Sequence, residues 1–102
     1  MAVTNETIMV TVEQLKDMKH TIGFSLDRCK KKKGQLTYTA FRNYFDAGKG
    51  GNTSLDLLVY QGFMTKKEVS ELWGGGIWYY VSQKGFEYIE AVTGVKIEEM
   101  EN

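Results

Sequence analysis

The segment that begins with three consecutive glycines, Gly74–Gly76, constrains the fold of this chain more than any other part of the sequence. The glycines predict a turn, and the five β-branched or aromatic residues after them, Ile77–Val81, predict a strand. Ser82 is a typical helix N-cap, so a final helix is expected from there to Gly94. Its inward residues are expected to be Phe86, Ile89 and either Val92 or Thr93. A strand that leads directly into a helix indicates a mixed α+β fold.

Helical patterns also occupy the first half of the chain. Thr11 and Gln14 match a capping box, and the helix that they begin is expected to run to about Ile22 and to end at Gly23. Its apolar residues at helical spacing are Leu15, Met18 and Ile22. A short second helix is expected at residues 41–45, where Phe41, Tyr44 and Phe45 would form one aromatic face.

A third helix is expected over residues 53–61. Thr53 and Asp56 can form its N-terminal cap. Its apolar residues are Leu55, Leu58 and Val59. Gly62 is expected to end this helix, with Phe63 packing back against the last turn.

Three stretches between the helices are less regular. Leu36–Thr39 fits a short strand or an extended lead-in, and Ala47–Asn52 fits a flexible connection. Residues 64–72 fit either a fourth short helix or the first strand of a hairpin with residues 77–81, and both alternatives stay open. The expected architecture is a small α+β domain of three to four helices, with a β-hairpin in its C-terminal half.

Length and composition fit a single domain, residues 1–102. The 42% of hydrophobic residues is enough to close one core without disulfide bonds. A single cysteine, the lack of an apolar run of about 18 residues and the lack of a signal peptide predict a cytoplasmic protein with no membrane contact. Val95 and Ile97 are expected to pack back on the domain, while residues 1–10 and 98–102 are expected to be flexible.

The two sides of the candidate hairpin carry patterns that occur together in a known family. Residues 58–64 read Leu-Val-Tyr-Gln-Gly-Phe-Met, and residues 79–89 read Tyr-Tyr-Val-Ser-Gln-Lys-Gly-Phe-Glu-Tyr-Ile. They resemble the end of the third helix, and then the end of the wing with the helix after it, in winged-helix (winged helix-turn-helix) domains. This resemblance, over about residues 53–92, implies a winged-helix-like fold. Together with Arg42–Phe45, the same stretches resemble small bacteriophage and prophage proteins, which implies no defined activity.

The charges of the sequence sum to zero but are unevenly distributed. Residues 16–49 carry nine Lys or Arg against three Asp, whereas residues 50–102 carry four Lys against eight acids. The run from Arg28 to Lys33 is expected to be an exposed loop or helix end, because adjacent lysines repel one another. It would hold nucleic-acid phosphates or an acidic protein surface, or else only keep the chain soluble. The candidate contact residues are Arg28, Lys30, Lys31, Lys32, Lys33, Lys49, Asn52, Thr53 and Ser54.

The region around the third predicted helix fits DNA recognition poorly. In a DNA-binding winged helix this element would lie in the major groove, yet residues 53–61 include Asp56 and neither Lys nor Arg. The preceding segment, Gly48–Thr53, resembles a phosphate-binding loop, but its Gly-Lys pair is not followed directly by Ser or Thr. A simple connector is therefore the preferred interpretation of that segment.

Aromatic side chains around the glycine turn form the candidate protein interface, which consists of Trp73, Trp78 and Tyr80. Alternation along the strand places Ile77, Tyr79 and Val81 on one face and Trp78 and Tyr80 on the other. The first face would join the core, and the second would anchor a protein partner or stack on bases. The alternative is that residues 8–10 cover the second face.

No residue pattern indicates catalysis, a metal or a cofactor. His20, the only histidine, lies opposite the apolar stripe of the first helix and lacks the converging ligands of a metal site. Cys29 has no evident base beside it, although the neighbouring lysines would lower the pKa of its thiol. The chain is therefore expected not to be an enzyme and to need no cofactor.

Two functions fit these observations. The first is DNA binding, as in a transcriptional regulator, which the winged-helix resemblance and the basic run support. The second is a phage-type interaction module that binds a host or partner protein through its aromatic hairpin, which the zero net charge favours. A homodimer that uses the same hairpin is a third hypothesis.

Overall fold

The computed structural model describes residues 10–99, which form a mixed α+β structure, as expected from the sequence. It has three α-helices and six β-strands, more strands than the one expected hairpin provides. The helices are α1 (Val12–Thr21), α2 (Thr53–Tyr60) and α3 (Gln83–Thr93), and none of them is long and apolar enough to cross a membrane. The strands are β1 (Lys30–Lys32), β2 (Gln35–Ala40), β3 (Phe45–Asp46), β4 (Met64–Glu68), β5 (Ile77–Val81) and β6 (Lys96–Glu99). Two short 3-10 helices, η1 (Leu26–Arg28) and η2 (Glu71–Trp73), precede β1 and β5.

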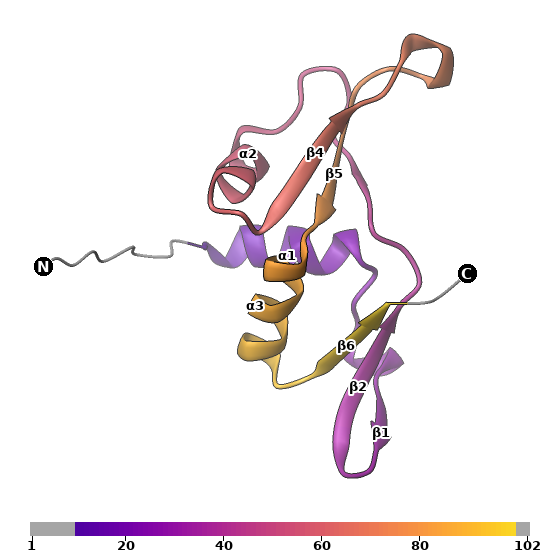
Figure 1. Ribbon diagram of the computed structural model, residues 1–102, viewed down its shortest axis with the longest axis vertical. Helices are drawn as coiled ribbons and strands as arrows, with labels where there is room; N and C mark the ends of the chain where they lie inside the picture. Colours follow the sequence, from indigo (N-terminus) through magenta and orange to yellow (C-terminus); the bar gives the residue numbers. More distant parts are fainter. Residues whose placement is uncertain (1–9, 100–102) are drawn as a thin grey trace, which may run out of the picture.

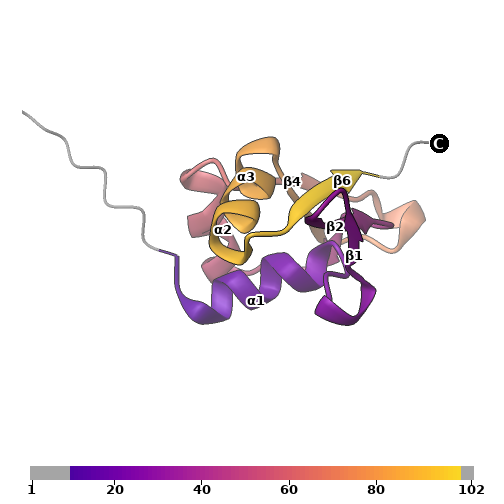
Figure 2. The same ribbon diagram turned by 90° about the horizontal axis from the view of Figure 1, so that it is seen from below.

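The strands form two small sheets. Sheet A has the order β1-β2-β6, in which β1 is antiparallel and β6 parallel to β2. Sheet B has the order β3-β5-β4, and both of its pairs are antiparallel. The β1–β2 and β4–β5 hairpins point to opposite ends of the molecule, and α1 crosses between them (Figure 1). In the view along the long axis, α1 lies on one side, while α3 and β6 lie on the other (Figure 2).

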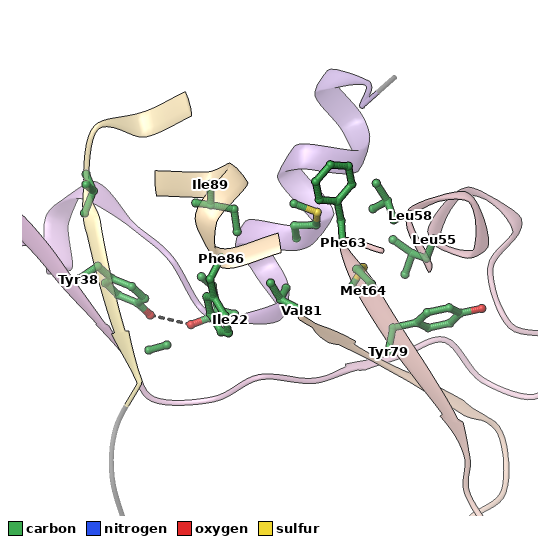
Figure 3. Packing of buried hydrophobic residues seen from close by; sticks show 13 residues of the cluster. Ile22, Tyr38, Leu55, Leu58, Phe63, Met64, Tyr79, Val81, Phe86 and Ile89 are labelled. Atoms are coloured by element: carbon green, nitrogen blue, oxygen red, sulfur yellow. Dashed lines mark hydrogen bonds between the residues drawn. The ribbon is translucent and has the colours of Figure 1, made fainter. Parts of the chain in front are cut away.

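One hydrophobic cluster joins the three helices to both sheets (Figure 3). Its buried members are Met18, Ile22, Tyr38, Ala40, Leu55, Leu58, Phe63, Met64, Tyr79, Val81, Phe86, Ile89 and Val95. The Tyr38 hydroxyl lies inside this cluster and donates a hydrogen bond of 2.8 Å to the carbonyl of Ile22. Burial of one large apolar side chain stabilises a fold by about 1.5–3 kcal/mol, so this cluster is the main force that holds the two sheets together.

The helix ends follow local capping chemistry. The capping box of Thr11 and Gln14 is present at α1, as predicted. The cap of α2 is Asn52 instead of Thr53, because Asn52 has an extended backbone and its Oδ1 accepts the amide proton of Leu55 at 3.0 Å. At the other end of α2, the amide of Phe63 donates to Leu58 O and the amide of Gly62 to Val59 O, which is the predicted glycine stop.

The last helix agrees with the sequence-based expectation in most respects. The Ser82 hydroxyl accepts the amide proton of Gly85 and caps α3, and Gly94 ends the helix with a φ of +74°. Phe86 and Ile89 are buried. Of the two alternatives for the next inward position, Thr93 is half-buried and Val92 is exposed.

The short helix expected at residues 41–45 is absent, and that prediction is wrong. The Asn43 side chain accepts the amide proton of Val81 at 2.8 Å and donates to its carbonyl at 3.0 Å, so it is bound to the end of β5. Phe45 then pairs with Tyr79 in β3. These contacts, which are remote in sequence, hold the segment out of the helical conformation that its spacing favours.

The lysines of the basic run are exposed, as expected, but the expectation of a loop or helix end is wrong for Lys30–Lys32. Lys30–Lys32 form β1, which pairs with Gln35–Thr37 across a two-residue turn. Lys33 and Gly34 both have positive φ angles, 51° and 81°, as a tight hairpin of this kind requires. The strand expected at residues 36–39 is confirmed as part of β2.

The remaining open stretches now have a defined structure. Residues 64–72 form β4 and the start of η2, so the hairpin alternative is the one observed. Ala47–Asn52 is a loop whose Gly48 carbonyl accepts the amide proton of Ile77 at 2.9 Å. Val95 is buried and Ile97 half-buried, but Glu98 and Glu99 belong to β6 and not to a flexible tail. The other terminal residues expected to be flexible, 1–9 and 100–102, lie outside the described part of the chain.

Candidate nucleic-acid interface

A basic hollow of about 260 Å³ lies against sheet A. Lys30 and Lys32 reach it together because alternate residues of a strand share a face. Arg28 enters from η1, the turn before β1. The full lining is Arg28, Lys30, Lys32, Thr37, Tyr38, Thr39 and Phe41. Three cations and the hydroxyl of the exposed Thr39 form a surface that suits phosphate oxygens, whereas Thr37 is buried and its hydroxyl donates to the Gln35 carbonyl at 3.3 Å.

The Phe41 ring, at the edge of this hollow, lies beside two guanidinium groups. The Cζ atom of Arg28 lies 5.2 Å from the ring centroid, and that of Arg42 lies 5.5 Å from it. Both distances are within the range of cation–π attraction. Phe41 remains 46% exposed and Arg28 is exposed, so both are accessible to a ligand. Arg42 is half-buried, and its Nε atom is buried with no hydrogen-bond partner among the described residues.

A second hollow, of about 240 Å³, continues from Arg42 towards sheet B. Its lining is His20, Arg42, Tyr44, Phe45 and Asp46. Tyr44 is 45% exposed and stacks on Trp78 of β5, with ring centroids 5.1 Å apart and an interplanar angle of 25°. The Arg42 guanidinium is positioned by a 2.7 Å hydrogen bond from its Nη2 to the carbonyl of His20.

Phe41 lines the first hollow and Arg42 the second, and the contact between them connects the two hollows into one surface, which we name the basic–aromatic strip. It consists of Arg28, Lys30, Lys32, Phe41, Arg42, Tyr44 and Trp78. Its middle part follows the chain that rises from the end of β2 along one side of the molecule towards sheet B (Figure 1). Alternating cations and accessible rings can bind phosphates and flat aromatic groups at the same time.

The predicted basic run contributes only part of its charge to this strip. Lys32 forms an ion pair with Glu98 of β6 at 3.3 Å, which offsets some of its charge. Lys31 alternates onto the opposite face of β1, and Lys33 lies in the turn. Among the described residues, neither Arg28 nor Lys30 forms an ion pair. Within the strip, these two side chains are therefore the cations most available to an anionic ligand.

The other predicted nucleic-acid contacts lie elsewhere. Lys49, Asn52, Thr53 and Ser54 lie before and within the start of α2, away from the β1–β2 hairpin (Figure 1). The Asn52 side chain is occupied as the cap of α2, and the Ser54 carbonyl accepts from the buried Gln14 side chain at 2.9 Å. The structure therefore does not bring the two halves of the predicted contact set together.

Asp56 is the one charged residue of the helix that the winged-helix resemblance would place in the DNA major groove, and it faces sheet B. The Tyr79 hydroxyl donates to Asp56 Oδ1 at 2.7 Å, and the Lys66 ammonium donates to the same oxygen at 3.0 Å. These two hydrogen bonds hold the pKa of the Asp56 carboxyl below its usual value. Its charge is thus used to fasten α2 to the β4–β5 hairpin.

Replacing Asp56 with asparagine is expected to lower the free energy of unfolding near neutral pH. A carboxyl whose pKa is lowered on folding stabilises the protein above its unfolded value of 3.8, and this contribution disappears as the pH falls through the folded value. The deficit of Asp56→Asn should therefore shrink between about pH 7 and about pH 3, measured by urea unfolding.

Asp17→Asn is the matched control for that experiment. Burial first, and then the charge of Glu13, raise the pKa of Asp17, so its ionised form costs stability. The control variant should be as stable as the wild type, or more so, near neutral pH. An equal deficit of Asp56→Asn at both pH values would contradict the role assigned to its charge.

The candidate protein-interface residues occupy different parts of the β4–β5 hairpin. Trp73 is 80% exposed on η2 at the tip, next to Leu72, which is 92% exposed. Trp78 and Tyr80 are half-buried on the outer face of β5, whereas Tyr79 and Val81 are buried on the inner face, as alternation predicted. Tyr44 covers part of Trp78. Of the segment expected to cover this face, Val10 packs against the core, and residues 8 and 9 lie outside the described residues.

His20 and Cys29 do not form a reactive pair. The His20 ring packs edge-on against Phe45, and the Cys29 thiol donates to the Ser25 carbonyl at 3.4 Å. Burial raises the pKa of the Cys29 thiol, so the expectation that the neighbouring lysines lower it is wrong. Within residues 10–99, no group of three or more His, Cys, Asp or Glu side chains could hold a metal ion.

Comparisons of the chain with known protein families, with characterised proteins and with solved structures give no match. The interpretation of the strip therefore depends on its own geometry and charge.

Three members of the strip are not among the site residues expected from the sequence. The spacing of Phe41 and Tyr44 assigns them to the aromatic face of a helix, and Arg42 lies between them with no predicted role. A helix prediction hides such residues because it places aromatic side chains in the core. The signal that could have found them is the local alternation of aromatic and cationic residues in Phe41-Arg42-Asn43-Tyr44.

Proposed function

We propose that this protein binds nucleic acid through the basic–aromatic strip and performs no catalysis. The observation that carries the proposal is that cations and aromatic rings follow one another over two adjoining hollows. Arg28, Lys30 and Lys32 come first, then Phe41 with the guanidinium groups of Arg28 and Arg42 beside it, and then the stacked Tyr44–Trp78 pair. Phosphate contacts supply most non-specific affinity for nucleic acids, and rings supply stacking. A role as a transcriptional regulator is the form of this function that the winged-helix resemblance suggests.

The scaffold proposed for this function is winged-helix-like. The support for it is a β-hairpin, β4–β5, that lies between α2 and α3 in the chain and pairs with a third short strand, β3. The scaffold would differ from the expected one in its second helix, because strands and an extended link occupy residues 30–46. Five of the seven strip residues, all except Arg28 and Trp78, lie on that replaced segment, so the binding surface would also differ from the groove helix that the resemblance implied.

The proposal predicts that affinity falls steeply with salt. Three to four neutralised phosphates correspond to a slope of about −2 to −4 in a plot of log affinity against log salt concentration. Fluorescence anisotropy with labelled mixed-sequence oligonucleotides, from about 50 to about 200 mM salt, measures this slope. Absence of binding at micromolar protein and the lowest salt, or an affinity that does not depend on salt, would overturn the proposal.

A second candidate function is a protein-interaction module, as in phage proteins that bind host factors. The observation in its favour is the pair of exposed apolar side chains, Leu72 and Trp73, at the tip of the β4–β5 hairpin. Exposed tryptophan is a common anchor of protein interfaces. A partner retained by the wild type and by Tyr60→Ala, but lost by Trp73→Ala, would favour this candidate over nucleic-acid binding.

A further inference from the structure

We infer that the ligand of the basic–aromatic strip is an unpaired nucleic-acid strand and not a duplex. This inference rests on the proposed function and specifies the form of nucleic acid that the strip takes. In a duplex the faces of the bases are covered by their neighbours, so accessible aromatic rings contribute little to its binding. In a single strand the bases are free to stack on such rings.

The exposure of the aromatic rings favours a single strand over a duplex. Phe41 and Tyr44 are both nearly half exposed, although each lies close to apolar neighbours. Tyr44 is held in place by its stack on Trp78, and the free side of such a pair offers a ready platform for a base. The guanidinium groups beside Phe41 are also planar cations on which bases stack.

The surface of α2 is poorly suited to a duplex. A duplex reader needs cations and free polar groups on the element that enters the groove. On α2 the exposed side chains include Leu57 and Tyr60, at 55% and 89%, and the single charge, Asp56, is bound to Tyr79 and Lys66. This helix also lies on the inner face of sheet B, opposite the face that carries Trp78. The features suited to nucleic acid are therefore concentrated on the strip.

The order of groups along the strip suggests how a strand would lie. Phosphates would occupy the hollow of Arg28 and Lys30, where the exposed Thr39 side chain offers a hydroxyl. The adjoining bases would stack beside Phe41 and on Tyr44, next to Trp78. The Thr39 hydroxyl and the cations would contact only the sugar-phosphate backbone, so binding should depend little on sequence.

The test compares an oligodeoxynucleotide of about 15 nucleotides, the oligoribonucleotide of the same sequence and the corresponding DNA duplex, because a single-strand site spans about 4–16 nucleotides. Binding is followed by anisotropy and, in a Trp73→Phe background, by quenching of the remaining tryptophan, Trp78. At least one of the two single strands should bind about tenfold more tightly than the duplex and quench Trp78. Phe41→Leu and Tyr44→Leu should each weaken this binding about tenfold, since each removes one stacking ring.

Tyr60→Leu is the matched control, because Tyr60 is an exposed tyrosine of α2 outside the strip. It should bind single strands as the wild type does. If no nucleic acid binds, the proposed function itself fails. If the duplex binds as tightly as both single strands, the inference of an unpaired strand fails while nucleic-acid binding stands. Equal weakening by Tyr60→Leu and Tyr44→Leu would show that the strip is not the site.

Discussion

Gly85→Ala is expected to destabilise the protein by about 3 kcal/mol, in spite of the better helix propensity of alanine. A Cβ at this position would overlap the carbonyl oxygen of Phe63 and lie 2.8 Å from Val81 Cγ1. The Phe63 carbonyl cannot move freely, because it accepts the amide proton of Ser82 at 3.0 Å. Gly85 is thus the point where the first turn of α3 lies directly on the backbone between α2 and β4.

Thermal unfolding followed by circular dichroism measures this effect. For a domain of about 100 residues, a loss of 3 kcal/mol corresponds to a decrease in Tm of roughly 12–24 °C. Gly50→Ala is the control, because a Cβ at Gly50 would meet no atom within 4 Å and the residue has no positive φ angle. The control should change Tm by only a few degrees. A Gly85→Ala protein as stable as Gly50→Ala would contradict the close contact between α3 and Phe63.

Charge reversal at the strip is expected to have the largest effect on binding. The double variant Arg28→Glu, Lys30→Glu replaces two exposed cations of the strip, neither of which forms an ion pair within the described chain. It should lower the affinity for oligonucleotides roughly 100-fold at low salt, because two phosphate contacts are lost and two repulsions are added. Both residues are exposed, so the free energy of unfolding should change by less than about 1 kcal/mol.

The control for charge reversal is Lys16→Glu, Lys84→Glu, which changes the net charge by the same amount. Lys16 lies on α1 and Lys84 in the first turn of α3, and neither belongs to the strip. Anisotropy titrations at one salt concentration should show at most a few-fold loss for this control. Similar losses for both double variants would mean that only net charge matters and that the strip has no special role.

The sequence predicts best those features that depend on neighbouring residues. The capping box at Thr11, the glycine stop at Gly62 and the Ser82 cap are each completed by contacts within five residues. The β5 strand is equally clear, because its five residues are all strand formers after a glycine turn. Local chemistry of this kind can be read directly from the order of residues.

Two of the failures involve contacts between distant parts of the chain. The helix expected at residues 41–45 is prevented by the hydrogen bonds of Asn43 to Val81. The tail expected after Ile97 is ordered by its parallel pairing with β2. No local pattern contains these partners, so spacing and propensity could not decide these two segments.

The candidate site also combines a feature that is visible in the local sequence with contacts that only the fold creates. The basic run is recognisable from composition, since Lys30–Lys33 are adjacent in the sequence. The other residues of the strip cannot be recognised from the sequence in this way. Phe41 contacts Arg28 only because the chain turns at Lys33–Gly34 and returns along β2. Trp78 reaches Tyr44 only through the pairing of β3 with β5. The position of the strip is thus a product of strand pairing and not of any single motif.

Binding at the strip can be located residue by residue in a titration of the ¹⁵N-labelled protein with a short single-stranded oligonucleotide, followed by amide chemical shifts. Binding at the strip predicts that the largest shifts occur at Arg28–Lys32, Phe41–Tyr44 and Trp78, with little change in α2. Shifts concentrated in α2, or at Leu72 and Trp73 alone, would contradict the account.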